Sequence, residues 1–436
     1  MSTPLAATTI AAAALLRPAS KLESERATSS AASANANHVR ESAEDKQKRK
    51  QIEAQNTRYP PGVYPDINTI RNAIPPHCFQ PSLWISCGYL LRDMLLIGAT
   101  AYVAIAFIPK IEDFYVRCAA WVAYGFIQGL FCTGLWILAH ECGHGGFSLH
   151  TRINNIIGWA AHSFLMVPYF SWKFSHARHH RFTGHMEKDM AFVPRTQADH
   201  EDRWMVRLGL GAEVLEDTPI VAFVRLVIHQ LFGWQAYLLF NVTAGPDSRQ
   251  PDGKQWGMQS HFDPTSSVFR PSERIYIAIS DLGLLIMGGF IYYGASVLGW
   301  STMALLYLVP YLWVHHWLVA ITYLHHTHPD VPHFDAENWT YVKGALATID
   351  RDFGFIGKTL FHGIIDTHVV HHLFSKIPFY YAEEATESIK PMLGDLYRTE
   401  KGFMRSLWPA FTELKYVVPS TEVVGEMRWA KSKKTE

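Results

Sequence analysis

The sequence predicts an all-α integral membrane protein with four transmembrane helices in two hairpins, interfacial helices and a helical cap. Four apolar stretches are about as long as the core of a bilayer requires. Many of the 23 histidines gather in three short clusters near these stretches. The formal net charge is zero, and the body of the chain has no basic stripe, which argues against a nucleic-acid partner.

The apolar stretches predict where the chain crosses the membrane. They cover residues 94–109, 118–139, 275–300 and 301–324. Two further stretches, residues 156–170 and 219–240, are apolar but shorter or broken by polar residues. These two favour amphipathic helices that lie in the membrane interface.

The order of spans and polar regions predicts the topology. Two spans, a long polar region, two more spans and a polar C-terminal region follow one another. Basic residues lie in the terminal and central polar regions, which the positive-inside rule assigns to the cytoplasm. We therefore expect each pair of spans to form a hairpin, with every long polar region and both termini on the cytoplasmic side.

Composition divides the chain into three regions. Residues 1–58 are rich in Ala, Ser, Thr, Lys and Glu, which predicts a disordered cytoplasmic tail. Residues 59–425 form the predicted membrane domain, and residues 426–436 a basic C-terminal tail. Lys433 and Lys434 in this tail match a dilysine retrieval signal, which favours the endoplasmic reticulum membrane.

The histidine clusters predict a metal centre. His140 and His144 follow the second span, and their four-residue spacing places both rings on one helix face. His326, at the end of the fourth span, is a ninth candidate. Imidazole binds iron, copper and zinc, and one metal takes about four to six ligands, so eight or nine histidines favour two metals. The remaining six candidates have similar spacing: His176, His179, His180, His368, His371 and His372.

Other interpretations compete with a metal-dependent enzyme. The segment from His140 to His144 matches the zinc-protease pattern, with Glu141 as the base, but that pattern leaves seven histidines unexplained. A histidine-rich metal transporter would place ligands near the middle of the membrane. His315 and His316 lie there, and His315 is about 16 Å along the helix axis from His326. Four further residues could support the ligand rings through hydrogen bonds or could simply lie at the surface: His325, His328, His333 and Asp366.

The three clusters, in this order, resemble the histidine boxes of membrane fatty-acid desaturases. Further segments are similar to the Δ12/ω3 branch of that family, namely residues 70–75, 165–168, 192–194, 233–240, 260–264 and 344–352. Residues 145–147, 311–326 and 353–358 look most like fungal ω3 (Δ15) or bifunctional Δ12/ω3 enzymes. Asp366 and Thr367 instead match the common Δ12 form.

This resemblance implies a function and a set of partners. It implies two iron ions on the nine histidines, O₂ as co-substrate, and an 18-carbon acyl-lipid or acyl-CoA substrate. A cis double bond would form at the ω3 (Δ15) position, the Δ12 position or both. The chain has no haem, flavin or ferredoxin motif, so a separate electron donor is expected. The resemblance implies that this donor is cytochrome b5 with its NADH-dependent reductase. Acetylenase, conjugase and hydroxylase activities remain open, because those enzymes use the same ligands.

Overall fold

Four long apolar helical segments organise the fold. The computed structural model describes residues 59–201, 218–249 and 259–430. Within these ranges, four helical segments are long and apolar enough to cross a membrane. They are α3 (Leu83–Phe107), α4 (Phe114–His144), α11 (Arg274–Leu298) and the continuous run of α12 (Trp300–Met303), the π-turn η5 (Ala304–Leu308) and α13 (Val309–His326). The four predicted spans are confirmed.

Local signals explain where these helices begin and end. The Asp113 carboxylate accepts a hydrogen bond from the Val116 amide at 2.8 Å and so caps the start of α4. Gly145 has a φ of 81° and ends the helix one residue after His144. The short linkers η2 (Ile108–Lys110) and Gly299 join the members of the two hairpins.

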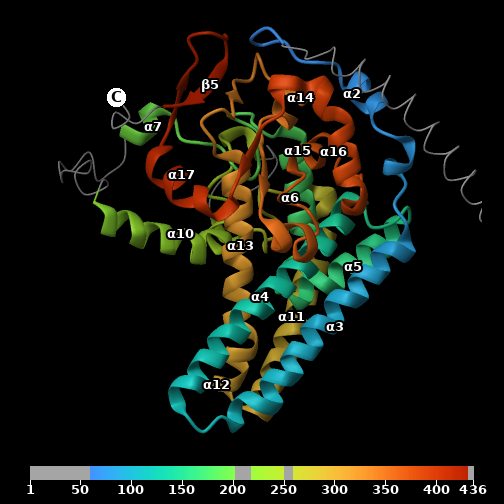
Figure 1. The fold of residues 1–436 in the computed structure, drawn as a ribbon, viewed down its shortest axis with the longest axis vertical. Helices are drawn as coiled ribbons and strands as arrows, with labels where there is room; N and C mark the ends of the chain where they lie inside the picture. Colours follow the sequence, from blue (N-terminus) through green and yellow to red (C-terminus); the bar gives the residue numbers. More distant parts are fainter. Residues whose placement is uncertain (1–58, 202–217, 250–258, 431–436) are drawn as a thin grey trace, which may run out of the picture. The chain divides into compact units, whose positions relative to one another are not determined.

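Shorter helices lie where the spans meet the cap. These are α5 (Thr151–Phe164), α6 (Tyr169–Phe182) and α10 (Pro219–Phe240). Figure 1 shows α10 running across the direction of the long helices at the base of the cap, as expected for an interfacial helix. The predicted apolar stretch 156–170 is not one helix, because the chain turns at Met166, whose φ is 54°, and α6 begins after Pro168.

The cap consists of short helices and two small sheets. Its helices are α2 (Ile67–Ala73), α7 (Gln197–Glu201), α14 (Tyr341–Ala345), α15 (His368–Leu373), α16 (Phe379–Leu393) and α17 (Leu407–Glu413). Single turns link them: η1 (Pro76–Phe79), η3 (Pro246–Ser248), η4 (Pro271–Glu273), η6 (Ile356–Leu360), η7 (Gly394–Leu396) and η8 (Phe403–Ser406).

The small sheets were not expected from the sequence. Strand β5 (Glu426–Trp429) pairs antiparallel with β1 (His333–Phe334) and β4 (Val417–Pro419), while β2 (Asp350–Asp352) runs parallel to β3 (Thr399–Lys401). Strands of two to four residues are too short to leave an alternating pattern in the sequence. Strand β5 also lies beyond residue 425, where the sequence placed the start of the tail. Residues 1–58 and 431–436, predicted as tails, lie outside the described residues.

Close packing of α4 against α13 joins the two hairpins. A Cβ atom added to Gly129 would lie 2.3 Å from Cβ of Trp313, so the backbone of α4 approaches α13 because residue 129 has no side chain. Leu135, Trp317 and Leu324 continue the buried interface toward the cap. This packing sets the position of both histidine-bearing helix ends.

We predict that Gly129→Val destabilises the protein by about 1–3 kcal/mol, because the added methyl groups overfill the α4–α13 interface. The measurement is the midpoint of thermal unfolding in detergent micelles. Gly98→Val in α3 is the matched control, since a Cβ there meets nothing within 4 Å. Equal midpoints for the two variants would contradict this account of the packing.

Candidate metal centre

All nine predicted histidines meet at the junction of the spans and the cap. His140 and His144 come from the last turns of α4, and His326 from the last residue of α13. Helix α6 contributes His176, His179 and His180, and α15 contributes His368, His371 and His372. The three boxes therefore meet at the end of the long helices where α4 and α13 finish, and they are in direct contact.

The histidines divide into two adjacent groups. In the five-histidine group, one ring nitrogen of each residue lies within 4.8 Å of the others; its members are His140, His144, His176, His180 and His371. The four-histidine group contains His179, His326 and His372 within the same limit, and His368, whose Nε2 lies 3.1 Å from Nε2 of His372. The rings of His180 and His372 stack with centroids 4.2 Å apart, so the groups adjoin.

Hydrogen bonding among the rings cannot account for the five-histidine group. The Nε2 atoms of His144, His140, His176 and His180 form a row with separations of 3.2, 3.1 and 3.1 Å. An imidazole nitrogen carries either one hydrogen or one lone pair, so at most two of these three contacts can be hydrogen bonds. Two nitrogens bound to one metal at about 2.1 Å lie about 3.0–3.4 Å apart. The spacing therefore fits a shared cation.

The four-histidine group has its Nε2 lone pairs aimed inward. Each Nδ1 faces an oxygen that accepts its hydrogen, which leaves Nε2 unprotonated in the neutral ring and suited to a metal. The acceptors are Asp189 Oδ1 for His179 (2.7 Å), Thr183 Oγ1 for His372 (3.0 Å), Ile364 O for His368 (3.2 Å) and Ala347 O for His326 (3.4 Å). Thr183 accepts here because its hydroxyl donates to the His179 carbonyl.

Burial favours the neutral form of five of the histidines on α6 and α15. Desolvation, followed by repulsion from neighbouring imidazoles, lowers the pKa of His176, His180 and His371 well below the ordinary value of histidine. The same two causes lower the pKa of His368 and His372. Neutral imidazole is the form that binds metal, so these five rings are in the metal-binding form at neutral pH.

An apolar cavity of about 370 Å³ borders the cluster. Side chains of α10 and α13 line most of it, including Phe232, Trp234 and Leu318. Five histidines of the cluster form one of its walls: His176, His179, His326, His368 and His372. An apolar molecule in this cavity would therefore contact the metal site directly.

Several polar residues considered from the sequence lie outside the cluster. His315 faces Gln235, whose Nε2 is 3.2 Å from the ring nitrogens, within the helix bundle. His325 places its two nitrogens 2.7 Å from Ile321 O and 3.0 Å from Ile365 O. His328 lies near Glu400, His333 near Trp429, and Asp366 lines a separate pocket.

Sequence reasoning missed the residues that orient the rings. Asp189 lies nine residues after His180 in a loop, and it also accepts hydrogen bonds from the amides of Gly184 and Ala191. Its position depends on how the loop folds back, for which no residue spacing provides a signal. Carbonyl acceptors such as Ile364 O cannot be predicted from the sequence either, because every residue has a backbone carbonyl.

We predict that Asp189→Asn lowers metal affinity about tenfold, because loss of the carboxylate charge weakens the support of His179. The measurement is bound metal per chain after dialysis against graded chelator concentrations. Asp330→Asn is the control, because the Asp330 side chain is largely exposed. Identical metal retention by both variants would show that Asp189 does not support the site.

The chain also matches known proteins along most of its length. Residues 119–402 match the family model described as fatty acid desaturase, and residues 6–102 match a domain of unknown function. An oleate hydroxylase of Claviceps purpurea is 46% identical over 82% of this chain and 78% of its own. A Δ12 fatty acid desaturase of Mortierella alpina is 41% identical (82% and 89%), and one of Arabidopsis thaliana is 39% identical (86% and 93%). The chain is an oxidoreductase of the membrane fatty-acid desaturase family.

Proposed function

We propose that the nine histidines bind two iron ions and that the enzyme desaturates 18-carbon acyl chains using O₂. The observation that carries this proposal is the pair of adjacent imidazole groups on the wall of an apolar cavity. Imidazole ligands suit iron, and a pair of irons with O₂ supplies the oxidising power that removal of hydrogen from an unactivated methylene demands.

In this proposal the protein selects and positions the acyl chain. The aromatic and aliphatic lining of the cavity favours a hydrocarbon and excludes water from the reacting carbons. Because the histidines occupy one wall, the bound chain would present a limited stretch of its length to the metals. No carboxylate base is assigned to the hydrogen removal, since a methylene is too weak an acid for such a base.

Relatives and motifs support two positions for the new double bond. The Δ12 desaturases among the relatives favour the conversion of oleate to linoleate. The motif resemblance favours the ω3 (Δ15) position, where linoleate would become α-linolenate. Hydroxylation is the second candidate, because an oleate hydroxylase is 46% identical to this chain.

The proposal also covers the membrane in which the enzyme lies, its orientation there and its electron donor. A relative from Brassica juncea is named as an endoplasmic-reticulum ω6 desaturase, and four candidate spans suit a multi-pass protein of that membrane. We place the histidine cluster and both termini on the cytoplasmic side, where cytochrome b5 and its reductase could supply electrons. The substrate would be an acyl-lipid or acyl-CoA.

Expression in a yeast that makes only monounsaturated fatty acids tests the proposal. We expect new 18:2 methyl esters by gas chromatography, and 18:3 esters as well if the enzyme acts at both positions. His371→Ala, which alters one proposed ligand, should abolish the products while the protein level is unchanged. A hydroxy product would favour the second candidate. Cells that express the wild-type protein and form no new acyl product, either with or without added linoleate, would contradict the proposal.

Filling the cavity tests where the acyl chain binds. Thr322 on α13 lines the cavity and is half-buried. We predict that Thr322→Phe lowers the turnover of oleate at least about tenfold, while metal content stays at the wild-type level, because the ring occupies the substrate's space.

Val297→Phe is the control, since Val297 on α11 is 64% exposed and lies outside the cavity. Product yield and metal per chain are measured for both variants. Unchanged turnover in Thr322→Phe would place the acyl chain elsewhere.

A further inference from the structure

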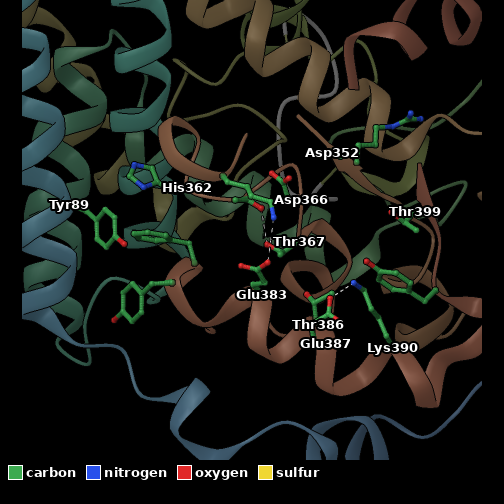
Figure 2. A pocket seen from close by; sticks show the side chains of 16 residues that line it. Tyr89, Asp352, His362, Asp366, Thr367, Glu383, Thr386, Glu387, Lys390 and Thr399 are labelled. Carbon is green, nitrogen blue, oxygen red and sulfur yellow. Dashed lines mark hydrogen bonds and ion pairs between the residues drawn. The ribbon is translucent and has the colours of Figure 1, made fainter. Parts of the chain in front are cut away.

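A second, polar pocket lies beside the third histidine box. It has a volume of about 410 Å³ and includes the side chains of Asp366 and Glu383 and those of Lys358 and Lys390. Figure 2 shows His362 at one end of this pocket and Lys390 and Thr399 at the other, with Asp366, Thr367 and Glu383 between them. Charges of both signs make it suited to water rather than to an acyl chain.

The polar pocket adjoins the metal centre through one narrow place. A small cavity of about 10 Å³ shares His362, Thr367 and Phe379 with the pocket, and its other walls include Glu141 and His371. This volume is close to the least that holds one water molecule. The polar pocket and a proposed metal ligand, His371, are therefore separated by a space for a single water.

His362 is held in a defined orientation at this narrow place. Its Nε2 lies 2.7 Å from Oδ2 of Asp93 on α3, and Arg92 donates to the other oxygen of the same carboxylate at 2.8 Å. The residue is 2% exposed and has a φ of 50°, a conformation that few non-glycine residues adopt. An imidazole with a carboxylate at one nitrogen and the other nitrogen free is arranged to pass protons.

Unpartnered polar atoms mark the same path. Nδ1 of His362, Oε2 of Glu141, Oδ2 of Asp366 and Oγ1 of Thr386 are buried and have no hydrogen-bond partner among the described residues. His362 and Glu141 both line the small cavity, so one water there has two polar partners. Thr386, which is 2% exposed, and Asp366 line the polar pocket.

We infer that the polar pocket, His362 and the small cavity form the route by which protons reach the metal centre and water leaves it. The inference rests on the proposed function. Desaturation combines R–CH₂–CH₂–R′, O₂, two electrons from the external donor and two protons, and yields R–CH=CH–R′ and two waters. The substrate's two hydrogens and the two protons supply the four hydrogens of those waters. The apolar cavity suits proton transfer less well, because most of its lining is aromatic and aliphatic.

The first test compares three variants in vesicles of dioleoyl phosphatidylcholine with cytochrome b5, its reductase and NADH. We expect His362→Gln to lower kcat about 100-fold, the scale of a lost proton-transfer group, with KM for oleoyl chains and metal per chain unchanged. Added imidazole should restore part of the rate. Asp93→Asn should lower kcat about three- to tenfold, because Asn supports a positively charged imidazole less well.

The matched control is His77→Gln, which makes the same change in an exposed histidine–carboxylate pair, His77 with Glu384 at 2.9 Å. Its kcat should equal that of the wild type. Wild-type kcat in His362→Gln, or a loss that follows loss of metal and does not respond to imidazole, would overturn the inference. A wild-type enzyme that forms no oxygen-dependent acyl product would instead overturn the proposed function.

A second readout does not depend on turnover. Exchange of the ring C2 hydrogen of each histidine with D₂O, followed by mass spectrometry, reports access of water to the ring. We expect His362 in the metal-loaded wild type to exchange at least about five times faster than His162, which is fully buried. Equally slow exchange at both positions would contradict a water route through His362.

Discussion

The convergence of nine imidazoles at the junction of the spans and the cap is the constraint on which the rest of the structure depends. Each Nε2 must reach the common site with its lone pair free, so each ring needs a fixed rotation and a fixed tautomer. Rigid helix ends meet this demand. Helices α4 and α13 end at His144 and His326, and their close packing through Gly129 brings those ends together. The other two helices of the site, α6 and α15, are short and serve mainly to present histidines.

Support for the rings comes from oxygens that are scattered along the chain. Asp189 and Thr183 belong to the segment that follows α6, while the carbonyls of Ala347 and Ile364 come from the C-terminal half. The cap therefore orients the imidazoles through these hydrogen bonds and also buries them. Its two small sheets tie β1 and β2 to strands near the C-terminus, which holds the loops around α15 in place.

The cluster separates two environments of opposite character. On one side the apolar cavity between α10 and α13 suits a hydrocarbon, and on the other the pocket around Asp366 and Glu383 suits water and ions. An oxidation that removes hydrogens from a lipid and forms water needs both. In the proposed function, such a division would place each reactant against the part of the metal site that has the matching polarity.

The sequence by itself determined the spans, the nine histidines and the family, because these rest on local patterns. Apolar length predicts a membrane helix, and four-residue spacing places two rings on one helix face. Only the tertiary structure decided how the histidines divide into two groups, that Asp189 orients His179, and that His362 meets Asp93 across 269 residues. It also decided that Asp366 faces a pocket rather than an imidazole. These contacts join residues far apart in the chain, so their distances depend on how helices and loops pack, which no local spacing records.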